Sequence, residues 1–185
     1  MRVITGTARG TNLKTPEGMH TRPTADRVKE ALFNVIQYEI RGEVLDLFAG
    51  TGQLGIEALS RGAAHAVFVD QRADAVGLVR ENLRRTHLSD RAEIYCGDYL
   101  TYLDRCTKRF DLIFLAPPYA EKSLENAILR ISEIDILADG GIIITERPRG
   151  KLLELELPGL TRSKDYNYGK TTITLFRRER REDIT

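Results

Sequence analysis

The sequence predicts a doubly wound α/β domain with a mostly parallel sheet of seven strands that ends in an antiparallel hairpin. Apolar, strand-like runs alternate with helical patterns from residue 43 onward, which is typical of a parallel sheet covered on both faces. The alternation ends in two strand-like runs that lie too close together to enclose a helix. A chain of 185 residues, 42% hydrophobic and 30% charged, also suits one folded domain and contains no run long enough to span a membrane.

The N-terminal part differs from this alternating pattern. Residues 1–24 are expected to form a small β-hairpin and a loop, because glycines punctuate short β-prone pieces there. We therefore assign 1–24 to an N-terminal extension and 25–185 to the main domain. A helix is predicted after Asp26, which suits a helix N-cap, since apolar residues recur at helical spacing from Val28 to Ile40.

The strands and helices of the main domain follow in order. Five buried strands are expected at 44–48, 66–70, 92–96, 110–115 and 141–146, with helices at about 53–61, 72–87 and 123–137. Two further strands, at about 161–167 and 171–176, must pair antiparallel because only a short turn separates them. Ligands of such sheets bind at the carboxyl ends of the strands, so the loops after the strands are the candidate site.

Charge and cysteine content limit the partners. The net charge is +3 over residues 1–30, −6 over 31–146 and +6 over 147–181. If the two basic ends fold onto one face, that face would suit a polyanion such as RNA; alternatively, the arginines at 177–181 form a solvated tail. Two isolated cysteines, and an N-terminus without an apolar leader, indicate a cytoplasmic protein. Three scattered histidines argue against a metal site.

The loop after the first strand carries a GxGxxG pattern at Gly50, Gly52 and Gly55. Alone, this pattern also fits a nicotinamide or flavin dinucleotide site, or a plain tight turn between strand and helix. Asp46, at the end of the strand, separates these alternatives. Its carboxylate would repel a pyrophosphate but could accept hydrogen bonds from an ammonium group of a ligand.

The next two strands also end in acidic residues. Asp70 closes the second strand, where a carboxylate can bind both hydroxyls of a ribose, and Gly97-Asp98 closes the third, where a carboxylate can accept from an adenine amino group. Asp70 and Asp98 could instead cap the helices that follow. Carboxylates at three successive strand ends favour a nucleoside-containing ligand.

The fourth strand ends in the turn Ala116-Pro117-Pro118-Tyr119. Two successive prolines fix the backbone and remove two donors, which leaves rigid carbonyls beside an aromatic ring. This arrangement suits capture of a flat nucleobase, with a carbonyl accepting from an exocyclic amine and Tyr119 stacking on the ring. The simpler alternative is a plain strand terminator.

Together these motifs resemble the class I S-adenosylmethionine-dependent methyltransferases. The segments that narrow the resemblance are Arg2–Gly6 with Arg9-Gly10, Thr21-Arg22-Pro23-Thr24, the run 26–34, and Tyr168-Gly169-Lys170-Thr171. They are similar to the RsmD-like family, which methylates the N2 amine of a guanine in small-subunit (16S) ribosomal RNA. The resemblance covers essentially the whole chain.

The resemblance implies a set of site residues and partners. S-adenosylmethionine would be the cofactor, bound by Asp46, Phe48, Gly50, Gly52, Asp70, Gly97 and Asp98. Ribosomal RNA, free or within a small-subunit particle, would contact Arg9, Arg22, Thr24, Arg27 and Lys170. The catalytic turn would be Ala116, Pro117, Pro118 and Tyr119, and the N-terminal extension would contact RNA.

One position departs from the family pattern. The turn normally begins with Asp or Asn, whose side chain accepts a hydrogen bond from the target amine, and the methyl group of Ala116 cannot do so. Three interpretations remain: an engineered inactivation, a natural variant that relies on the Pro117 carbonyl, or a protein that binds cofactor and RNA without methylating. An amine methyltransferase acting on DNA adenine or protein glutamine is a further alternative, because Pro-Pro-Tyr turns are shared among these enzymes.

Overall fold

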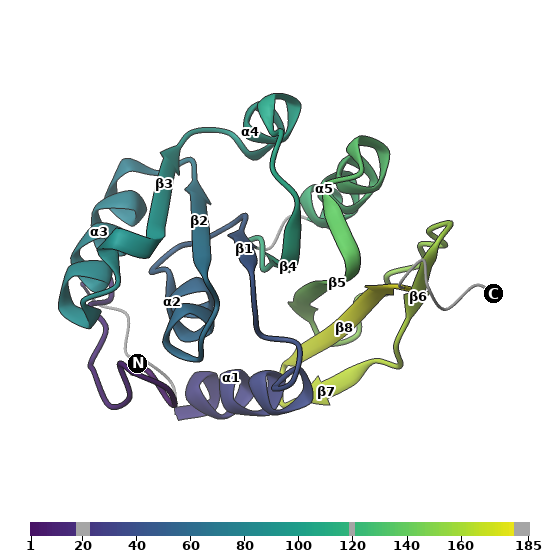
Figure 1. The fold of residues 1–185 in the computed structure, drawn as a ribbon. Helices are drawn as coiled ribbons and strands as arrows, with labels where there is room; N and C mark the ends of the chain where they lie inside the picture. The colour runs from purple at the N-terminus through teal and green to yellow at the C-terminus, as the bar shows by residue number, and fades with distance from the viewer. Residues whose placement is uncertain (18–22, 119–120, 180–185) are drawn as a thin grey trace.

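The computed structural model of the protein describes residues 1–17, 23–118 and 121–179. These residues form one eight-stranded sheet with helices on both faces (Figure 1). The strand order is β3-β2-β1-β4-β5-β8-β6, and β7 pairs with β8 outside this path. The predicted α/β class, with a doubly wound and mostly parallel sheet, is confirmed.

The elements have the following bounds. The strands are β1 (Glu43–Asp46), β2 (His65–Asp70), β3 (Ala92–Cys96), β4 (Phe110–Leu115), β5 (Leu137–Pro148), β6 (Leu160–Arg162), β7 (Tyr166–Tyr168) and β8 (Thr171–Arg178). The helices are α1 (Pro23–Val35), α2 (Gln53–Ser60), α3 (Ala73–Thr86), the 3-10 helix η1 (Ser89–Arg91), α4 (Tyr99–Arg105) and α5 (Glu121–Ile134). Among the residues described, no helix has both the length and the apolar character needed to cross a bilayer.

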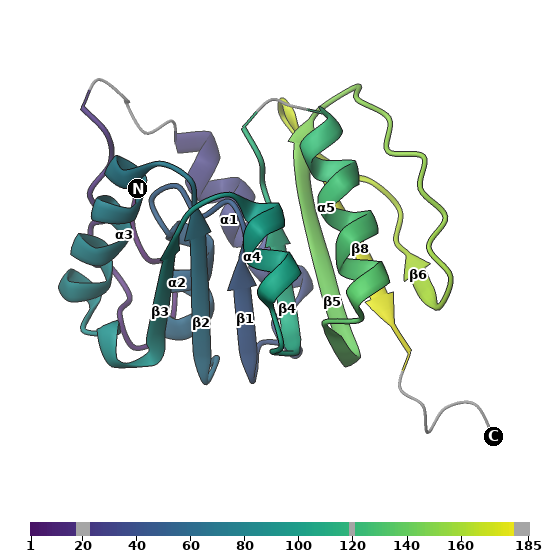
Figure 2. The same ribbon diagram turned by 90° about the horizontal axis from the view of Figure 1, so that it is seen from above.

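The strand order reverses beside β1. This strand pairs in parallel with β2 on one side and with β4 on the other, and the parallel pairing continues to β3 and β5. Figure 2 shows the carboxyl ends of these strands along one edge of the sheet, with α1 beginning close to the same edge. Because ligands of doubly wound sheets bind where the order reverses, this carboxyl edge is the candidate site.

A buried apolar cluster lies on each face of the sheet. The α1 face, covered by α1, α2 and α3, contains Phe33, Ile56 and Leu83. The α5 face, covered by α4 and α5, contains Leu103 and Ile128. Alternate side chains of the central strands enter both clusters, which is why these strands read as continuous apolar runs.

The first 17 residues, here called the N-terminal arm, pack onto the α1 face. The predicted hairpin is reduced to a single isolated bridge between Arg2 and Asn12. Val3 and Leu13 belong to the same buried cluster as α1, α2 and α3. Backbone hydrogen bonds within the arm, such as those from the Val3 amide to the Thr11 carbonyl and from the Leu13 amide to the Met1 carbonyl, both at 3.0 Å, therefore hold it together with side chains from the helices.

A buried carboxylate anchors the arm. Glu57 of α2 is fully buried and accepts hydrogen bonds from the amides of Ile4 and Thr5 at 2.9 and 3.0 Å. The Nζ of Lys29, on α1, lies 3.5 Å from the same carboxylate and donates to the Arg2 carbonyl at 2.6 Å. Burial lowers the pKa of Lys29, against the opposing effect of Glu57. One carboxylate thus joins the arm, α1 and α2.

The bounds of two helices differ from those predicted. Helix α1 begins at Pro23, because the fixed φ of proline suits the first helical position, and it ends at Val35 rather than Ile40. The prediction that Asp26 caps this helix is wrong: the residue lies within the first turn, and its Oδ1 is buried without a hydrogen bond to any described residue. Helix α5 ends at Ile134 because Asp135 adopts a φ of 55°.

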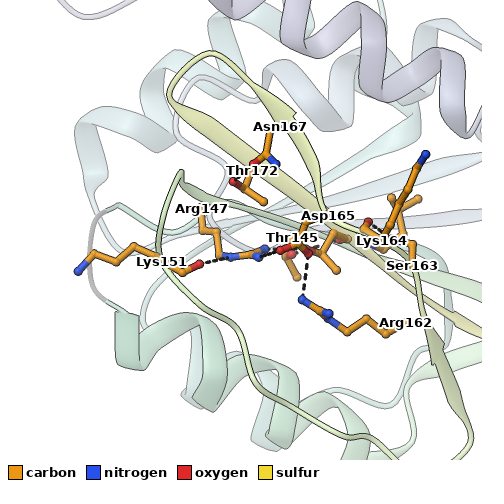
Figure 3. Close-up of polar contacts among 11 residues, drawn as sticks. Thr145, Arg147, Lys151, Arg162, Ser163, Lys164, Asp165, Asn167 and Thr172 are labelled. Carbon is orange, nitrogen blue, oxygen red and sulfur yellow. Dashed lines mark hydrogen bonds and ion pairs between the residues drawn. The ribbon is translucent and has the colours of Figure 1, made fainter.

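The C-terminal half of the sheet also contains one strand more than predicted. The expected strand at 161–167 is divided into β6 and β7, because Asp165 between them turns toward a buried arginine (Figure 3). Arg147 Nη2 donates to Asp165 at 2.6 Å, and the Thr174 hydroxyl and Arg162 also donate to this carboxylate, at 2.7 and 2.9 Å. Both short strands still pair antiparallel with β8.

The two described arginines of the C-terminal basic cluster, Arg177 and Arg178, lie away from the carboxyl edge. Arg177 pairs with Glu39 at 3.3 Å, and Arg178 pairs with Asp135 and donates to the carbonyl of Leu137, the first residue of β5. These two arginines are thus engaged in structural ion pairs near the start of β5. The other arginines of the cluster lie outside the described residues.

Replacement of Glu57 with alanine is expected to lower the free energy of unfolding by about 3–5 kcal/mol, because it leaves the buried Lys29 cation without its counter-charge. Chemical denaturation followed by circular dichroism measures this loss. As a control, Glu81→Gln removes a carboxylate that pairs with Arg84 and Arg85 on the surface of α3, and should change stability far less. Equal losses in the two variants would contradict the anchoring role of Glu57.

Candidate active site

Two glycines give the loop between β1 and α2 its shape. Gly50 and Gly52 adopt φ angles of 56° and 78°, which side chains rarely tolerate, and Gly52 caps α2. A Cβ at Gly55 would lie 2.4 Å from the Phe68 ring, so the absence of a side chain lets α2 pack directly on β2. No atom lies within 4 Å of a Cβ built at Gly50, so its backbone is open to close approach by a ligand.

Asp46 is the last residue of β1 and is only 1% exposed. Burial raises the pKa of its carboxyl to about 7. The Gly55 amide, which donates to Oδ2 at 3.1 Å, opposes this shift, whereas the charges of Asp70 and Glu146 reinforce it. A nearby positive charge would stabilise the ionised form of this carboxyl, so Asp46 is well suited to a cationic partner at this edge.

Asp70, at the end of β2, holds the glycine loop. Its Oδ2 accepts from the Gly50 amide and its Oδ1 from the Arg72 amide, both at 2.9 Å. It does not cap α3, whose N-cap is Arg72 without a side-chain hydrogen bond. Each carboxylate oxygen can accept more than one hydrogen bond, so Asp70 retains acceptor capacity toward a ligand.

The end of β3 joins the same region. The Gly97 amide donates to the Asp70 carbonyl at 3.0 Å. Asp98 caps α4, its Oδ1 accepting from the Thr101 amide at 3.0 Å, and its side chain is exposed. The helix-cap interpretation of Asp98 is therefore observed, and its Oδ2 makes no hydrogen bond within the described part of the chain.

Aromatic side chains line the edge between β1 and α4. The ring of Phe48, in the loop after β1, lies 5.0 Å from that of Tyr99, the first residue of α4. Both side chains are half-buried and pack against the α5-face cluster. They form an apolar surface beside the carboxylates, of the kind that an adenine ring could contact.

The turn after β4 brings the candidate catalytic residues to this edge. Ala116 is half-buried and packs against the α1-face cluster, so its methyl group lies on the face that carries Asp46. Pro117 is half-buried and Pro118 is exposed. Tyr119 lies outside the described residues.

The candidate RNA-contacting residues are divided between two places. Arg27 is exposed in the first part of α1, and Lys170 is exposed in the turn between β7 and β8. Helix α1 begins near the carboxyl edge (Figure 2), and Thr171, which follows Lys170, pairs with Pro148 at the carboxyl end of β5. The Lys170 carbonyl accepts from the Arg149 amide at 2.8 Å, so Arg149, which was not predicted from the sequence, is a third exposed cation here. Thr24 belongs to α1 but its side chain is outside the described part, as is the whole of Arg22.

Arg9 lies elsewhere. It is exposed in a turn of the N-terminal arm whose neighbours, Thr7 and Ala8, donate to the carbonyl and hydroxyl oxygens of Ser60 at 2.8 and 3.0 Å. Ser60 ends α2, which is 8 residues long, so Arg9 is separated from the glycine loop by roughly 12 Å of helix. The structure does not bring Arg9 together with the other predicted site residues.

Two polar residues at this edge were not identified from the sequence. Asn82 of α3 donates to the Thr51 carbonyl at 2.9 Å and exchanges two hydrogen bonds with the Lys14 backbone, which links the glycine loop to the N-terminal arm. Glu146 of β5 carries a half-buried carboxylate that contributes to the raised pKa of Asp46. A strand-end carboxylate is the same signal that identified Asp46 and Asp70, whereas no local pattern marks Asn82.

Residues 1–177 match the protein family described as "Conserved hypothetical protein 95". The chain belongs to this family. A Bacillus subtilis (strain 168) relative of the family, named "Putative rRNA methyltransferase YlbH", is 41% identical over 186 residues, covering 96% of this chain and 99% of the relative. The Haemophilus influenzae protein named "Ribosomal RNA small subunit methyltransferase D" is 36% identical over 157 residues, covering 83% of this chain and 81% of its own.

The fold agrees with solved structures of similar proteins. The Escherichia coli structure described as "Putative methyltransferase yhhF" superposes with a TM-score of 0.86 at 31% identity, over 97% of this chain and 98% of the other. The sequence-based assignment to an RsmD-like family of rRNA methyltransferases is thereby confirmed, as is the methyltransferase fold.

The raised pKa of Asp46 predicts a pH dependence of stability. Between pH 4 and 7 the folded protein keeps a proton on Asp46 that the unfolded chain has lost, so the free energy of unfolding falls as pH rises through this window. Asp46→Asn should remove this contribution and raise stability at pH 8 by an amount on the order of a few kcal/mol. Denaturant unfolding at pH 5 and pH 8 measures it.

Asp90, which is exposed in η1, provides the matched control for this substitution. Asp90→Asn should leave the difference in stability between pH 5 and pH 8 unchanged. If Asp46→Asn behaves in the same way, the carboxyl of Asp46 titrates normally and its burial does not have the expected effect.

Proposed function

We propose that this protein transfers a methyl group from S-adenosylmethionine to the N2 amine of a guanine in small-subunit (16S) ribosomal RNA. The observation that carries the proposal is the meeting, at one edge of the sheet, of the buried Asp46 carboxylate with the Ala116-Pro117-Pro118 turn. The names of the relatives supply the reaction class, because they refer to methylation of ribosomal RNA of the small subunit.

The residues at this edge fit such a cofactor. The Asp46 carboxylate would bind the amino group of the cofactor. Burial disfavours the ionised form of Asp46, and the positive charge of that amino group would favour it again. The remaining lone pairs of Asp70 would accept from the ribose hydroxyls, and Asp98 would accept from the adenine amine. Gly50, Gly52 and Gly97 would allow close backbone approach, and Phe48 would contact the adenine ring.

When bound, S-adenosylmethionine supplies a methyl group on a positively charged sulfur, which is already a strong electrophile. The protein would therefore contribute mainly proximity and orientation, worth roughly 7–11 kcal/mol in favourable cases. The Pro117 carbonyl would accept one hydrogen of the guanine amine, and Tyr119 would stack on the base. The proton lost from the nitrogen can pass to water after transfer, so a strong general base is not required.

The direct test uses the full chain with cofactor labelled in its methyl group. Free small-subunit ribosomal RNA, small-subunit particles and double-stranded DNA are offered separately, and the modified nucleoside is identified by mass spectrometry. The proposal expects N2-methylguanosine in one of the two RNA samples. Label in DNA adenine, or in no nucleic acid, would overturn it.

A second candidate function is a protein that binds cofactor and RNA without methylating, and Ala116 is the observation that favours it. If this second candidate holds, the site lacks an acceptor that it needs, and Ala116→Asp and Ala116→Asn should raise the methylation rate, because a single well-placed acceptor is commonly worth 10²–10³-fold, or roughly 3–4 kcal/mol. Single-turnover kinetics measures the rate, and calorimetry should show unchanged cofactor affinity. Equal rates in all three proteins would show that an acceptor at position 116 is dispensable.

The exposed cations predict how RNA binding depends on salt. Arg27→Ala and Lys170→Ala should each weaken RNA binding uniformly across sequences, and each should reduce the slope of log affinity against log salt by about one. Arg9→Ala tests whether the RNA also extends along α2 to the far end of the arm. Arg105→Ala, an exposed arginine at the end of α4, is the control that should have no effect. Unchanged slopes for both Arg27→Ala and Lys170→Ala would remove the carboxyl edge from the RNA interface.

A further inference from the structure

The Glu146 carboxylate near the end of β5 is not used by the fold. Its backbone pairs with Ile173 of β8, but its side chain makes no hydrogen bond or ion pair with any residue that the structure describes. The side chain is half-buried, and burial raises the pKa of its carboxyl. A partly desolvated carboxylate without a partner is costly to maintain, which is a reason to look for its ligand.

The strand register places Glu146 on the α1 face. Ile142 and Ile144, two and four residues earlier, belong to the α1-face cluster, and side chains alternate along a strand. Arg147, the next residue, points to the opposite face, where its guanidinium pairs with Asp165 (Figure 3). The ion pair holds the Arg147 side chain on the α5 face, and the Glu146 side chain therefore lies on the α1 face.

The same register makes Glu146 a neighbour of the catalytic turn. Leu115 and Thr145 form the last pair between β4 and β5, so Ala116 and Glu146 each lie one residue beyond it, on strands about 4.8 Å apart. Both side chains lie on the face that carries Asp46: Ala116 follows β4, the strand next to β1, and Glu146 is on β5, one strand beyond β4. Glu146 therefore places a carboxylate beside the position where the family turn normally has its acceptor.

We propose that Glu146 is a positioning and specificity residue that accepts hydrogen bonds from the N1–H and one N2–H of the target guanine. This inference rests on the function proposed above and names the group that selects the base. With the other N2–H donated to the Pro117 carbonyl, both hydrogens of the amine would have acceptors without a side chain at position 116. The Glu146 carboxylate thus accounts for how the turn tolerates Ala116.

The chemistry of the two purines explains the selectivity. Guanine presents two adjacent donors, N1–H and N2–H, which match the two oxygens of an ionised carboxylate. Adenine presents its amine beside N1, which is an acceptor, so the same carboxylate would face a lone pair. A site of this kind favours guanine through repulsion of the wrong base as well as attraction of the right one.

The test exchanges a hydrogen-bond acceptor for a donor on the protein and a donor for an acceptor on the base. Glu146→Gln keeps the shape of the side chain but supplies one acceptor and one donor. The substrate is the RNA that the wild-type protein methylates, with the target guanine replaced in a second sample by 2-aminopurine, which keeps the N2 amine but has an acceptor at N1. Wild-type protein should prefer guanine, and Glu146→Gln should lower kcat/KM for guanine by about 10- to 100-fold and shift the preference toward 2-aminopurine.

Controls separate this role from a structural one. Cofactor affinity by calorimetry and the thermal unfolding midpoint should be almost unchanged in Glu146→Gln. The matched control is Glu154→Gln, which removes an exposed carboxylate from the segment after β5 and should alter neither rate nor base preference. If Glu146→Gln fails to fold, Glu146→Asp replaces it, and should lower the rate while keeping the preference for guanine.

The outcomes distinguish this inference from the proposed function. If the wild-type protein methylates guanine, but Glu146→Gln keeps the wild-type kcat/KM and the wild-type ratio of guanine to 2-aminopurine, the role of Glu146 is overturned and the function stands. An unchanged rate in Glu146→Asp would likewise overturn the role of Glu146 and leave the proposed function standing. Absence of methyl transfer to any RNA by the wild-type protein overturns the function itself, and the inference with it.

Discussion

The parallel pairing of β1 with both β2 and β4 is the constraint on which the rest of the site depends. Because the chain leaves β1 toward β2 and returns on its other side as β4, the loops after all five parallel strands meet at one edge. Asp46 is buried in the centre of this sheet, and its place at the last position of its strand puts its carboxylate at the edge where a ligand would meet it. The glycine loop and Asp70 are then fixed around it by backbone hydrogen bonds.

Local patterns were sufficient for the strands but not for all boundaries. The parallel strands are continuous apolar runs, and burial on both faces leaves no other environment for such sequences. The division of the strand at 161–167 depends instead on the Arg147–Asp165 ion pair, between residues on different segments, which no window of local sequence contains. The start of α1 was placed too late because a proline was interpreted as the end of a loop rather than the first helical residue.

The same distinction applies to the site. Asp46, Asp70 and Asp98 could be selected from the sequence because strand ends converge in this fold, and Glu146 satisfies that criterion equally well although it was not selected. Asn82 and Glu57 could not be found in this way. Each is a polar residue within a helix, and its importance arises only when a segment some 50 to 70 residues distant in the chain packs against it.

The way the N-terminal arm is held has a consequence for synthesis of the chain. The backbone of Ile4, Ala8 and Lys14 is made before its partners on Glu57, Ser60 and Asn82, which belong to helices that follow in the chain. Contacts so distant in sequence form slowly, because the entropy of closing a long loop is lost before any contact is gained. The arm therefore waits without its partners while the chain is made and reaches its place only after α3 is complete, although it precedes every helix that holds it.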